Sequence, residues 1–148
     1  MQTFLPFPDF QRSASVLDWR RLGKQRIEAR HIVEVLLGIK PHSRYRNHAA
    51  VRMWRGFGHF LCSYGVAICQ EWRGRGYRDQ QLEAFQRLRK LAEREDQHGT
   101  PPWFGDAAFH AAHRAALLAK APEWYGQFGW QEIPLVDYVW PAGVAYGA

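Results

Sequence analysis

The sequence predicts an all-α protein, built as one compact domain of four or five helices over residues 1–148. Apolar side chains recur at the helical period in several segments, and most of these segments end near glycine or proline. A chain of 148 residues is also long enough to bury a substantial core as a single domain. Only residues 135–139 have a pattern that suggests a short strand.

The first helix is expected close to the N-terminus. Residues 1–8 are extended because two prolines fix their backbone, and Asp9 or Ser13 can cap a helix that runs to about Arg21. Gly23 is expected to end or bend that helix, because glycine is a poor residue for a helix interior.

A second helix is expected over residues 24–37, ending at Gly38. A basic loop over residues 41–47 follows it. A long third helix is predicted over residues 48–73, because apolar residues repeat there near the helical period. The glycines inside this helix, such as Gly65, are expected to allow close helix packing or a bend.

Two further helices are predicted, over residues 80–95 and from Asp106 to about Lys120. The first carries an apolar stripe, and the second begins at an acidic N-cap after the loop of residues 97–105. Residues 122–148 form an aromatic C-terminal tail that we expect to pack on the helices. Trp54 and Trp72 are assigned to the core.

Charge and aromatic content favour nucleic acid as the partner. The net charge is +6, and aromatic residues make up 15% of the chain, a combination suited to a polyanion whose bases can stack. No segment has the apolar length of a membrane span or the pattern of a signal peptide. We therefore expect a cytoplasmic or nucleoid-associated protein with no membrane partner, in which Cys62 and Cys69 are buried and reduced.

Several short motifs follow one another over roughly residues 15–130. Residues 19–24 read WRRLGK, residues 75–77 read RGY, and residues 122–129 read PEWYGQFG. Their order resembles that of the pyrimidine dimer DNA glycosylases, including the phage endonuclease V, which have aromatic–Arg–Glu–Leu–Pro–Arg, Arg–Gly–Phe and Pro–x–Trp–Tyr–x–x–aromatic–Gly segments. Bacterial members resemble further blocks, at residues 21–26, 46–48, 51–54 and 103–114.

The resemblance implies an all-α fold, a basic concave surface that grips kinked DNA, and no cofactor. It also implies that a free amine attacks the sugar C1′ of a damaged nucleotide and forms a Schiff base. A nearby glutamate then assists ring opening and strand cleavage by β-elimination. An uncharged amine is a good nucleophile, and extrusion of the nucleotide makes its sugar accessible.

Two positions depart from the family pattern. The family's amine belongs to a small second residue exposed by loss of the initiator Met, whereas Gln2 disfavours that loss, so we expect Met1 to stay. The position of the family's glutamate is matched by Arg21, which has no acid–base role at neutral pH. Glu28 lies two turns further on and shares that face only if the helix continues through Gly23.

Lys24 and Glu28 form an i,i+4 pair, with His31 on the next turn, and offer a substitute for the missing groups. A lysine desolvated beside Arg20 and Arg21 would have a lowered pKa and could form the Schiff base, with Glu28 moving protons. The alternative is an exposed helix salt bridge worth about 0.3–0.5 kcal/mol.

His110, His113 and Arg114 are expected on one face of their helix, because they are three or four residues apart. We expect this face to bind a phosphate or to protonate a leaving base, with the two histidines as catalytic residues. A solvated polar stripe is the first alternative. A metal site completed by His48 or His59 is the second, although we expect no bound metal.

The remaining candidates are side chains that would contact nucleic acid. Asn47 and His48 are expected to open the long helix, where free backbone amides can meet a phosphate, and an ordinary Asn N-cap is the alternative. Trp103, Trp124 and Tyr125 are expected to stack on unpaired bases, at about 1–3 kcal/mol each. The groups expected to hold the nucleic-acid backbone are Arg20, Arg21, Lys24, Arg26, Arg44, Arg46, Arg52, Arg55 and Arg114.

These features together predict a DNA glycosylase for a damaged or modified base, with damaged duplex DNA as its partner and AP-lyase activity left open. The hypothesis requires the polar faces around Glu28 and around His110 to converge on one cationic cleft. Two alternatives remain: a non-catalytic nucleic-acid-binding module, favoured by Arg21, and an N-glycosidase of free nucleotides that uses His110, His113 and Glu28 in a closed pocket.

Overall fold

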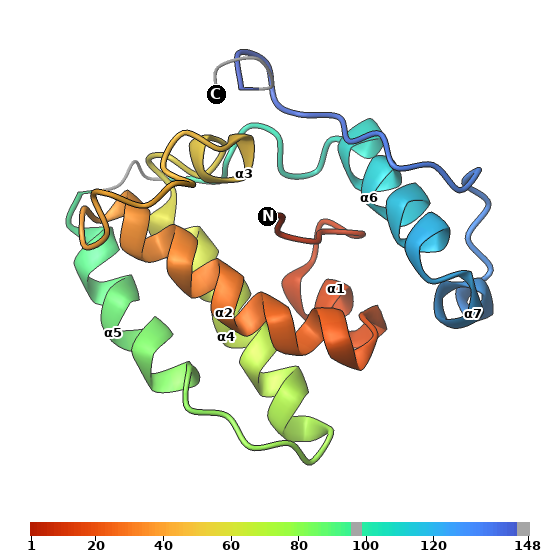
Figure 1. The fold of residues 1–148 in the computed structure, drawn as a ribbon, viewed down its shortest axis with the longest axis horizontal. Helices are drawn as coiled ribbons and strands as arrows, with labels where there is room; N and C mark the ends of the chain where they lie inside the picture. The colour runs from red at the N-terminus through yellow and green to blue at the C-terminus, as the bar shows by residue number, and fades with distance from the viewer. Residues whose placement is uncertain (96–98, 145–148) are drawn as a thin grey trace.

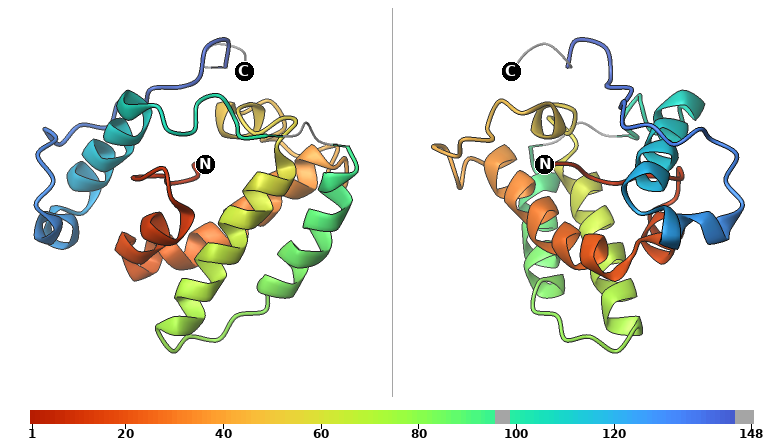
Figure 2. Two further views of the ribbon diagram at one scale, coloured as in Figure 1. Left: turned by 180° about the vertical axis from the view of Figure 1, so that it is seen from behind. Right: turned by 45° about the vertical axis from the view of Figure 1, so that its right-hand side comes forward.

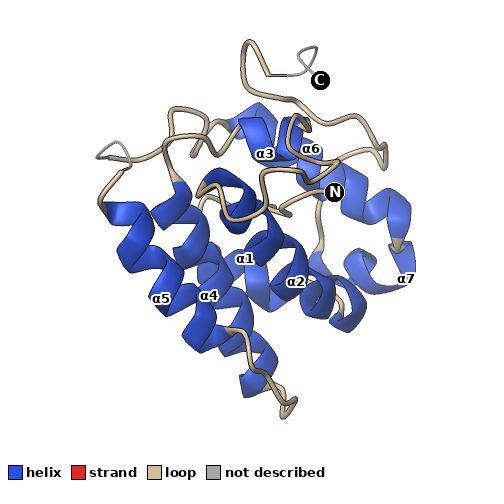
Figure 3. Cartoon of the chain, turned by 60° about the vertical axis from the view of Figure 1, so that its left-hand side comes forward, coloured by secondary structure: helices blue, strands red, loops and turns tan. Residues whose placement is uncertain are grey.

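The computed structural model describes residues 1–95 and 99–144, and over these residues the chain is helical with no strand (Figures 1 and 3). The predicted all-α class is therefore confirmed. The helices are α1 (Phe10–Val16), α2 (Trp19–Leu36), α3 (Ala49–Arg52), α4 (Gly58–Gly74), α5 (Leu82–Glu93), α6 (Ala107–Lys120), α7 (Pro122–Tyr125) and the 3-10 turn η1 (Gly126–Phe128). The described α-helices outnumber the four or five expected for two reasons. The long helix predicted over residues 48–73 is divided into α3 and α4, and α7 forms within the tail.

The helices form two groups on either side of the N-terminal segment. Helix α4 packs against α2, α5 and α1, whereas α6 and α7 pack on each other, and α7 reaches the first group through bonds from Trp124 to Val16 and from Tyr125 to Asp18 (Figures 1 and 2). The extended N-terminal residues run between α2 and α6. None of the helices over residues 1–95 and 99–144 has the length and apolar character to cross a membrane.

Helix α2 is continuous through Gly23, so the predicted helix end there is wrong. Asp9 caps α1, which stops at Val16, and Asp18 caps the separate helix α2. Gly23 serves as a packing position, because a Cβ atom there would lie 2.9 Å from Cη2 of Trp72. Its residue type alone predicts a helix break, whereas the Trp72 ring that it packs against belongs to α4, far along the chain.

The long helix predicted over residues 48–73 is interrupted. Helix α3 ends at Arg52 and α4 begins at Gly58, and between them Gly56 has a φ of 84°, in the region that favours glycine. The expectation of close packing at Gly65 is confirmed, because a Cβ atom there would lie 2.4 Å from Cε1 of Phe85 in α5.

After α7 and η1, the described part of the C-terminal tail runs as irregular chain back toward α3 (Figure 3). Leu135 donates its amide to the carbonyl of Ala115 in α6, 3.1 Å away. The guanidinium of Arg52 donates to the carbonyls of Gly143 and Val144. Residues 135–139 thus form no strand, and Arg52, expected to hold DNA, binds the tail instead.

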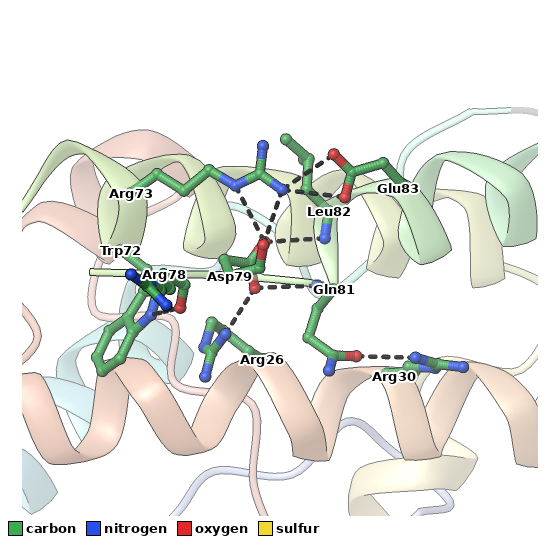
Figure 4. A network of polar contacts seen from close by, with 9 residues as sticks. All are labelled: Arg26, Arg30, Trp72, Arg73, Arg78, Asp79, Gln81, Leu82 and Glu83. Carbon is green, nitrogen blue, oxygen red and sulfur yellow. Dashed lines mark hydrogen bonds and ion pairs between the residues drawn. The ribbon is translucent and has the colours of Figure 1, made fainter. Parts of the chain in front are cut away.

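The side chain of Asp79 joins α2, α4 and the start of α5 (Figure 4). Its carboxylate accepts from Nη1 of Arg26 at 2.6 Å and from the amides of Gln81 and Leu82, and pairs with Nε of Arg73 at 3.3 Å. Arg26 also lies over the Trp72 ring. Arg26 was expected to contact DNA, but its charge is used inside the fold.

Trp54, Cys62 and Cys69 are buried in the core, as expected. Trp72, also assigned there, is only partly buried and packs against the core from its edge.

Candidate active site

The N-terminal residues form an extended segment whose backbone bonds to side chains instead of to another strand. Gln25 in α2 donates from Nε2 to the Gln2 carbonyl at 2.8 Å and accepts from the Phe4 amide at 3.0 Å. The hydroxyl of Tyr64 in α4 lies 2.8 Å from the Phe4 carbonyl. Ser13 binds both the amide and the carbonyl of Phe7. Helices on both sides therefore fix where the segment runs.

His110 and His113 belong to this set of anchors. The Leu5 amide donates to Nδ1 of His113 at 2.9 Å, and Nδ1 of His110 lies 2.8 Å from the Leu5 carbonyl. The Gly105 amide donates to Nε2 of His110, so His110 carries its proton on Nδ1 and donates to Leu5. Both rings are 1% exposed. The expectation that they face a cleft shared with Glu28 is wrong, so the enzymatic hypothesis fails in the form that needs both faces, and only the groove at Glu28 is left as a candidate site.

Because the rings act as hydrogen-bond acceptors, their protonation would remove contacts that hold the N-terminal segment. Burial lowers the pKa of His113 to about 3, from its ordinary value of 6.5, and burial also lowers that of His110. The nitrogens that accept from Leu5 and Gly105 are unavailable to a metal. Among the described residues, no group of three or more His, Cys, Asp or Glu side chains has a metal-binding arrangement.

The fold should therefore lose stability below neutral pH. An unfolded chain protonates its histidines below pH 6.5, whereas folded His113 resists protonation to about pH 3, so stability falls as pH drops through this window. From pH 7.5 to pH 5, His113 alone should lower the free energy of unfolding by about 2 kcal/mol. Urea unfolding at the two pH values measures this loss.

The variant His113→Asn is the control for that measurement, because its amide oxygen takes the position of Nδ1, can accept from Leu5 and has no proton to gain. Its free energy of unfolding should depend less on pH between 5 and 7.5 than that of the unmodified chain. Equal pH dependence in the two proteins would contradict the role assigned to His113.

A groove of about 860 Å³ lies where the N-terminus meets the first half of α2 and the C-terminal third of the chain. Cationic side chains are common among the residues that line it. The lining includes Met1, Gln2, Trp19, Arg20, Arg21, Lys24, Glu28, Lys120, Glu123, Trp124 and Tyr138. It contains neither His110 nor His113. The predicted N-glycosidase of free nucleotides thus loses two of its three catalytic residues.

Glu28 is the acidic group closest to the N-terminal backbone in this groove. Its Oε2 lies 3.5 Å from the backbone nitrogen of Gln2 and accepts from Nε2 of Gln25 at 3.2 Å. Because α2 is continuous, Glu28 follows Arg21 by two turns of the same helix and lines the same groove. The condition that the sequence left open for Glu28 is therefore met.

Lys24 pairs with the other carboxylate oxygen of Glu28, at 3.5 Å. Its side chain is 75% exposed, so the desolvation that was expected to activate it as a nucleophile is absent. The geometry corresponds to the alternative interpretation, an exposed i,i+4 salt bridge on the rim of the groove.

His48, not Asn47, caps α3, and its Nδ1 accepts from the Ala50 amide at 3.0 Å. Burial and then the positive charge of the terminal amine lower the pKa of His48. The Asn N-cap that the sequence offered as an alternative is not formed.

The other predicted DNA-binding residues fall into two groups, and the first group lies at the surface, either in the groove or near the loop after α2. Arg20, Arg21 and Trp124 line the groove, and Arg21 also pairs with Asp18 at 3.2 Å. Exposed groups near the loop after α2 are Arg44, Arg46, Asn47 and Arg55.

The second group is used inside the protein. Trp103 is buried and donates from Nε1 to the Met53 carbonyl, and Tyr125 is buried with its hydroxyl on Asp18. Neither ring is free to stack on a base. Arg114 binds Glu132 at 2.8 Å and the Pro6 carbonyl at 2.7 Å, so its expected role as a phosphate ligand is wrong.

Sequence reasoning missed Gln25, Lys120 and Tyr138, because each meets the site only through the tertiary fold. Gln25 stands between two residues that were singled out, yet a lone glutamine in a helix carries no local signal. Lys120 and Tyr138 are distant from α2 in the chain and line the groove opposite it.

A comparison with known families gave a match that covers most of the chain. A family model described as pyrimidine dimer DNA glycosylase matches residues 1–100. The match includes the N-terminal segment, all of α2 and Glu28. Neither the curated proteins nor the solved structures gave a match.

Proposed function

Because the chain belongs to the pyrimidine dimer DNA glycosylase family, we propose that it removes a damaged pyrimidine from duplex DNA with its N-terminal α-amine as nucleophile. Glu28 is the group that moves protons in this proposal. The observation that carries it is the separation of 3.5 Å between Oε2 of Glu28 and the backbone nitrogen of Gln2. A carboxylate thus stands beside the start of the chain, inside a cationic groove.

The reaction needs one nucleophile and one group that accepts and returns protons. The uncharged amine donates its electron pair to C1′, and the glycosidic bond breaks as the base leaves with the bonding electrons and takes up a proton. Loss of O4′ as a hydroxyl then gives the Schiff base. Removal of a C2′ proton by Glu28 breaks the C3′–O3′ bond, which is the lyase step.

The α-amine is a better candidate than Lys24. The α-amines of protein chains have an ordinary pKa of about 8, whereas lysine side chains have one of about 10.4. An α-amine therefore loses its proton at a lower pH than a lysine side chain. Lys24 points into solvent and is paired with Glu28. The N-terminal segment, in contrast, is fixed by buried partners on both sides.

The groove is suited to a polyanion. Arg20, Arg21 and Lys24 lie along α2 at the groove, where they can neutralise phosphates without reading sequence. Trp124 and the exposed Trp19 line the same groove and can stack on unpaired bases. We take the DNA of the cytoplasm or nucleoid as the expected substrate.

Borohydride trapping on DNA with an abasic site tests the nucleophile. The unmodified chain should form a covalent adduct, because borohydride reduces a Schiff base to a stable amine. A chain with a few extra residues before Met1 should form none, and removal of those residues by a protease should restore trapping. Lys24→Ala should still trap, and the intact mass of the protein shows whether Met1 or Gln2 carries the amine.

An adduct in the extended chain that disappears in Lys24→Ala would assign the nucleophile to Lys24. No adduct with the unmodified chain, although the DNA binds, would remove the amine mechanism and leave a binding module.

A further inference from the structure

We propose that Gln25 is a positioning residue that holds the amine-bearing end of the chain against Glu28. This inference rests on the proposed function. The carboxamide of Gln25 is 1% exposed and occupies the point where the N-terminal segment, α2 and α4 meet. All of its hydrogen-bonding capacity is used there, so its orientation is fixed.

The nitrogen of the carboxamide bridges the N-terminal backbone and Glu28. Nε2 donates to the Gln2 carbonyl at 2.8 Å and to Oε2 of Glu28 at 3.2 Å. The same carboxylate oxygen lies 3.5 Å from the Gln2 backbone nitrogen. The carboxamide nitrogen of Gln25 therefore fixes the distance between the backbone of Gln2 and the carboxylate of Glu28.

The oxygen of the carboxamide fixes the other side. Oε1 accepts from the Phe4 amide at 3.0 Å and lies 2.6 Å from the Tyr64 hydroxyl. Burial raises the pKa of Tyr64 well above its ordinary value, so the hydroxyl keeps its single proton, which it shares between Oε1 and the Phe4 carbonyl 2.8 Å away. Because Oε1 faces donors and Nε2 faces acceptors, the amide cannot be flipped without losing these bonds.

The effect of losing Gln25 should be local. The segment beyond Phe4 keeps its own anchors, since His113 and His110 bind Leu5 and Ser13 binds Phe7. Only the first residues lose their hold when Gln25 changes. A displacement of the amine by about 1 Å can cost about 10²-fold in rate, because the reacting atoms must be aligned.

Gln25→Glu tests the proposal, because it keeps the shape and replaces the donor with a second carboxylate beside Glu28. We expect the rate of adduct formation to fall by about 10- to 100-fold, with DNA affinity within about threefold of the unmodified chain. The acidic limb of the pH–rate profile should move to higher pH, because a like charge makes Glu28 harder to ionise.

Two variants separate positioning from general support of the fold. Gln25→Met has similar length and no charge, and should lose rate without moving the acidic limb. Gln81→Met is the matched control, because the Gln81 carboxamide accepts from Arg30 and none of its bonds reaches the N-terminal segment, and it should trap at close to the unmodified rate. Circular dichroism of each variant shows whether it folds.

Adduct formation at the unmodified rate in Gln25→Met, or an equal loss in Gln81→Met, would overturn the assignment. If the unmodified chain forms no adduct, the proposed function fails and this inference fails with it. If the unmodified chain traps and both Gln25 variants trap equally well, only this inference fails.

Discussion

Glu28→Gln is expected to lower the rate of adduct formation and strand cleavage by about 10²- to 10⁴-fold, the range for loss of a general acid–base group. The carboxylate lies 3.5 Å from the Gln2 nitrogen and is the proton acceptor of the proposed lyase step. Glutamine has the same shape but cannot take a proton at neutral pH. Single-turnover kinetics on DNA with an abasic site would measure the loss.

DNA binding should be nearly unchanged in Glu28→Gln, or slightly tighter, because the substitution removes a negative charge from a cationic groove. Glu123→Gln is the matched control, since Glu123 lines the same groove and the charge change is identical. The control should retain its rate. A similar loss in both variants would indicate that groove charge, not proton transfer by Glu28, explains the effect.

Local patterns were sufficient to predict the helical class and several boundaries. The acidic N-cap at Asp106 and the apolar repeat after it predicted a helix that ends near Lys120, and α6 spans Ala107–Lys120. Errors arose where a distant partner decides the backbone. Gly23 lies against Trp72, and this contact lets α2 continue through a residue that usually ends helices.

The candidate site was predictable in part. Spacing alone placed Glu28 and Lys24 on one face of a helix, and both line the groove. Spacing also placed His110 and His113 on one face, but it could not show that this face turns inward. Their partner is the backbone of Leu5, more than 100 residues earlier in the chain, which no local pattern indicates.

Local patterns also could not reveal the partners of the N-terminal segment. Its prolines correctly suggested extended backbone, yet an extended segment without a strand partner needs other groups for its amides and carbonyls. Those groups are side chains from α1, α2, α4 and α6. The resemblance to the family suggested the amine mechanism. The tertiary contacts then identified the groove beside Glu28 as the site where we propose that it occurs.

Asp79→Ala should lower the free energy of unfolding by about 3–5 kcal/mol, the cost of breaking a buried ion pair by removing one partner. The Asp79 side chain is 0% exposed, and Arg26 is mostly buried against it. Removal of the carboxylate leaves that guanidinium without its partner and also leaves the amides of Gln81 and Leu82 without their acceptor. Urea unfolding at neutral pH measures the change.

Glu83→Ala separates this buried network from ordinary surface pairing. Glu83 binds Arg73, the second cation of the network, but its side chain is 58% exposed, so its loss should lower the free energy of unfolding far less than the loss of Asp79. Burial alone would raise the pKa of Asp79, but the bonds from Arg26 and the two amides lower it below its ordinary value of 3.8. The stability that Asp79 contributes should therefore persist at pH 5 and disappear only in stronger acid, which distinguishes it from the histidine effect. An Asp79→Ala protein as stable as Glu83→Ala would show that the three helices are held without this carboxylate.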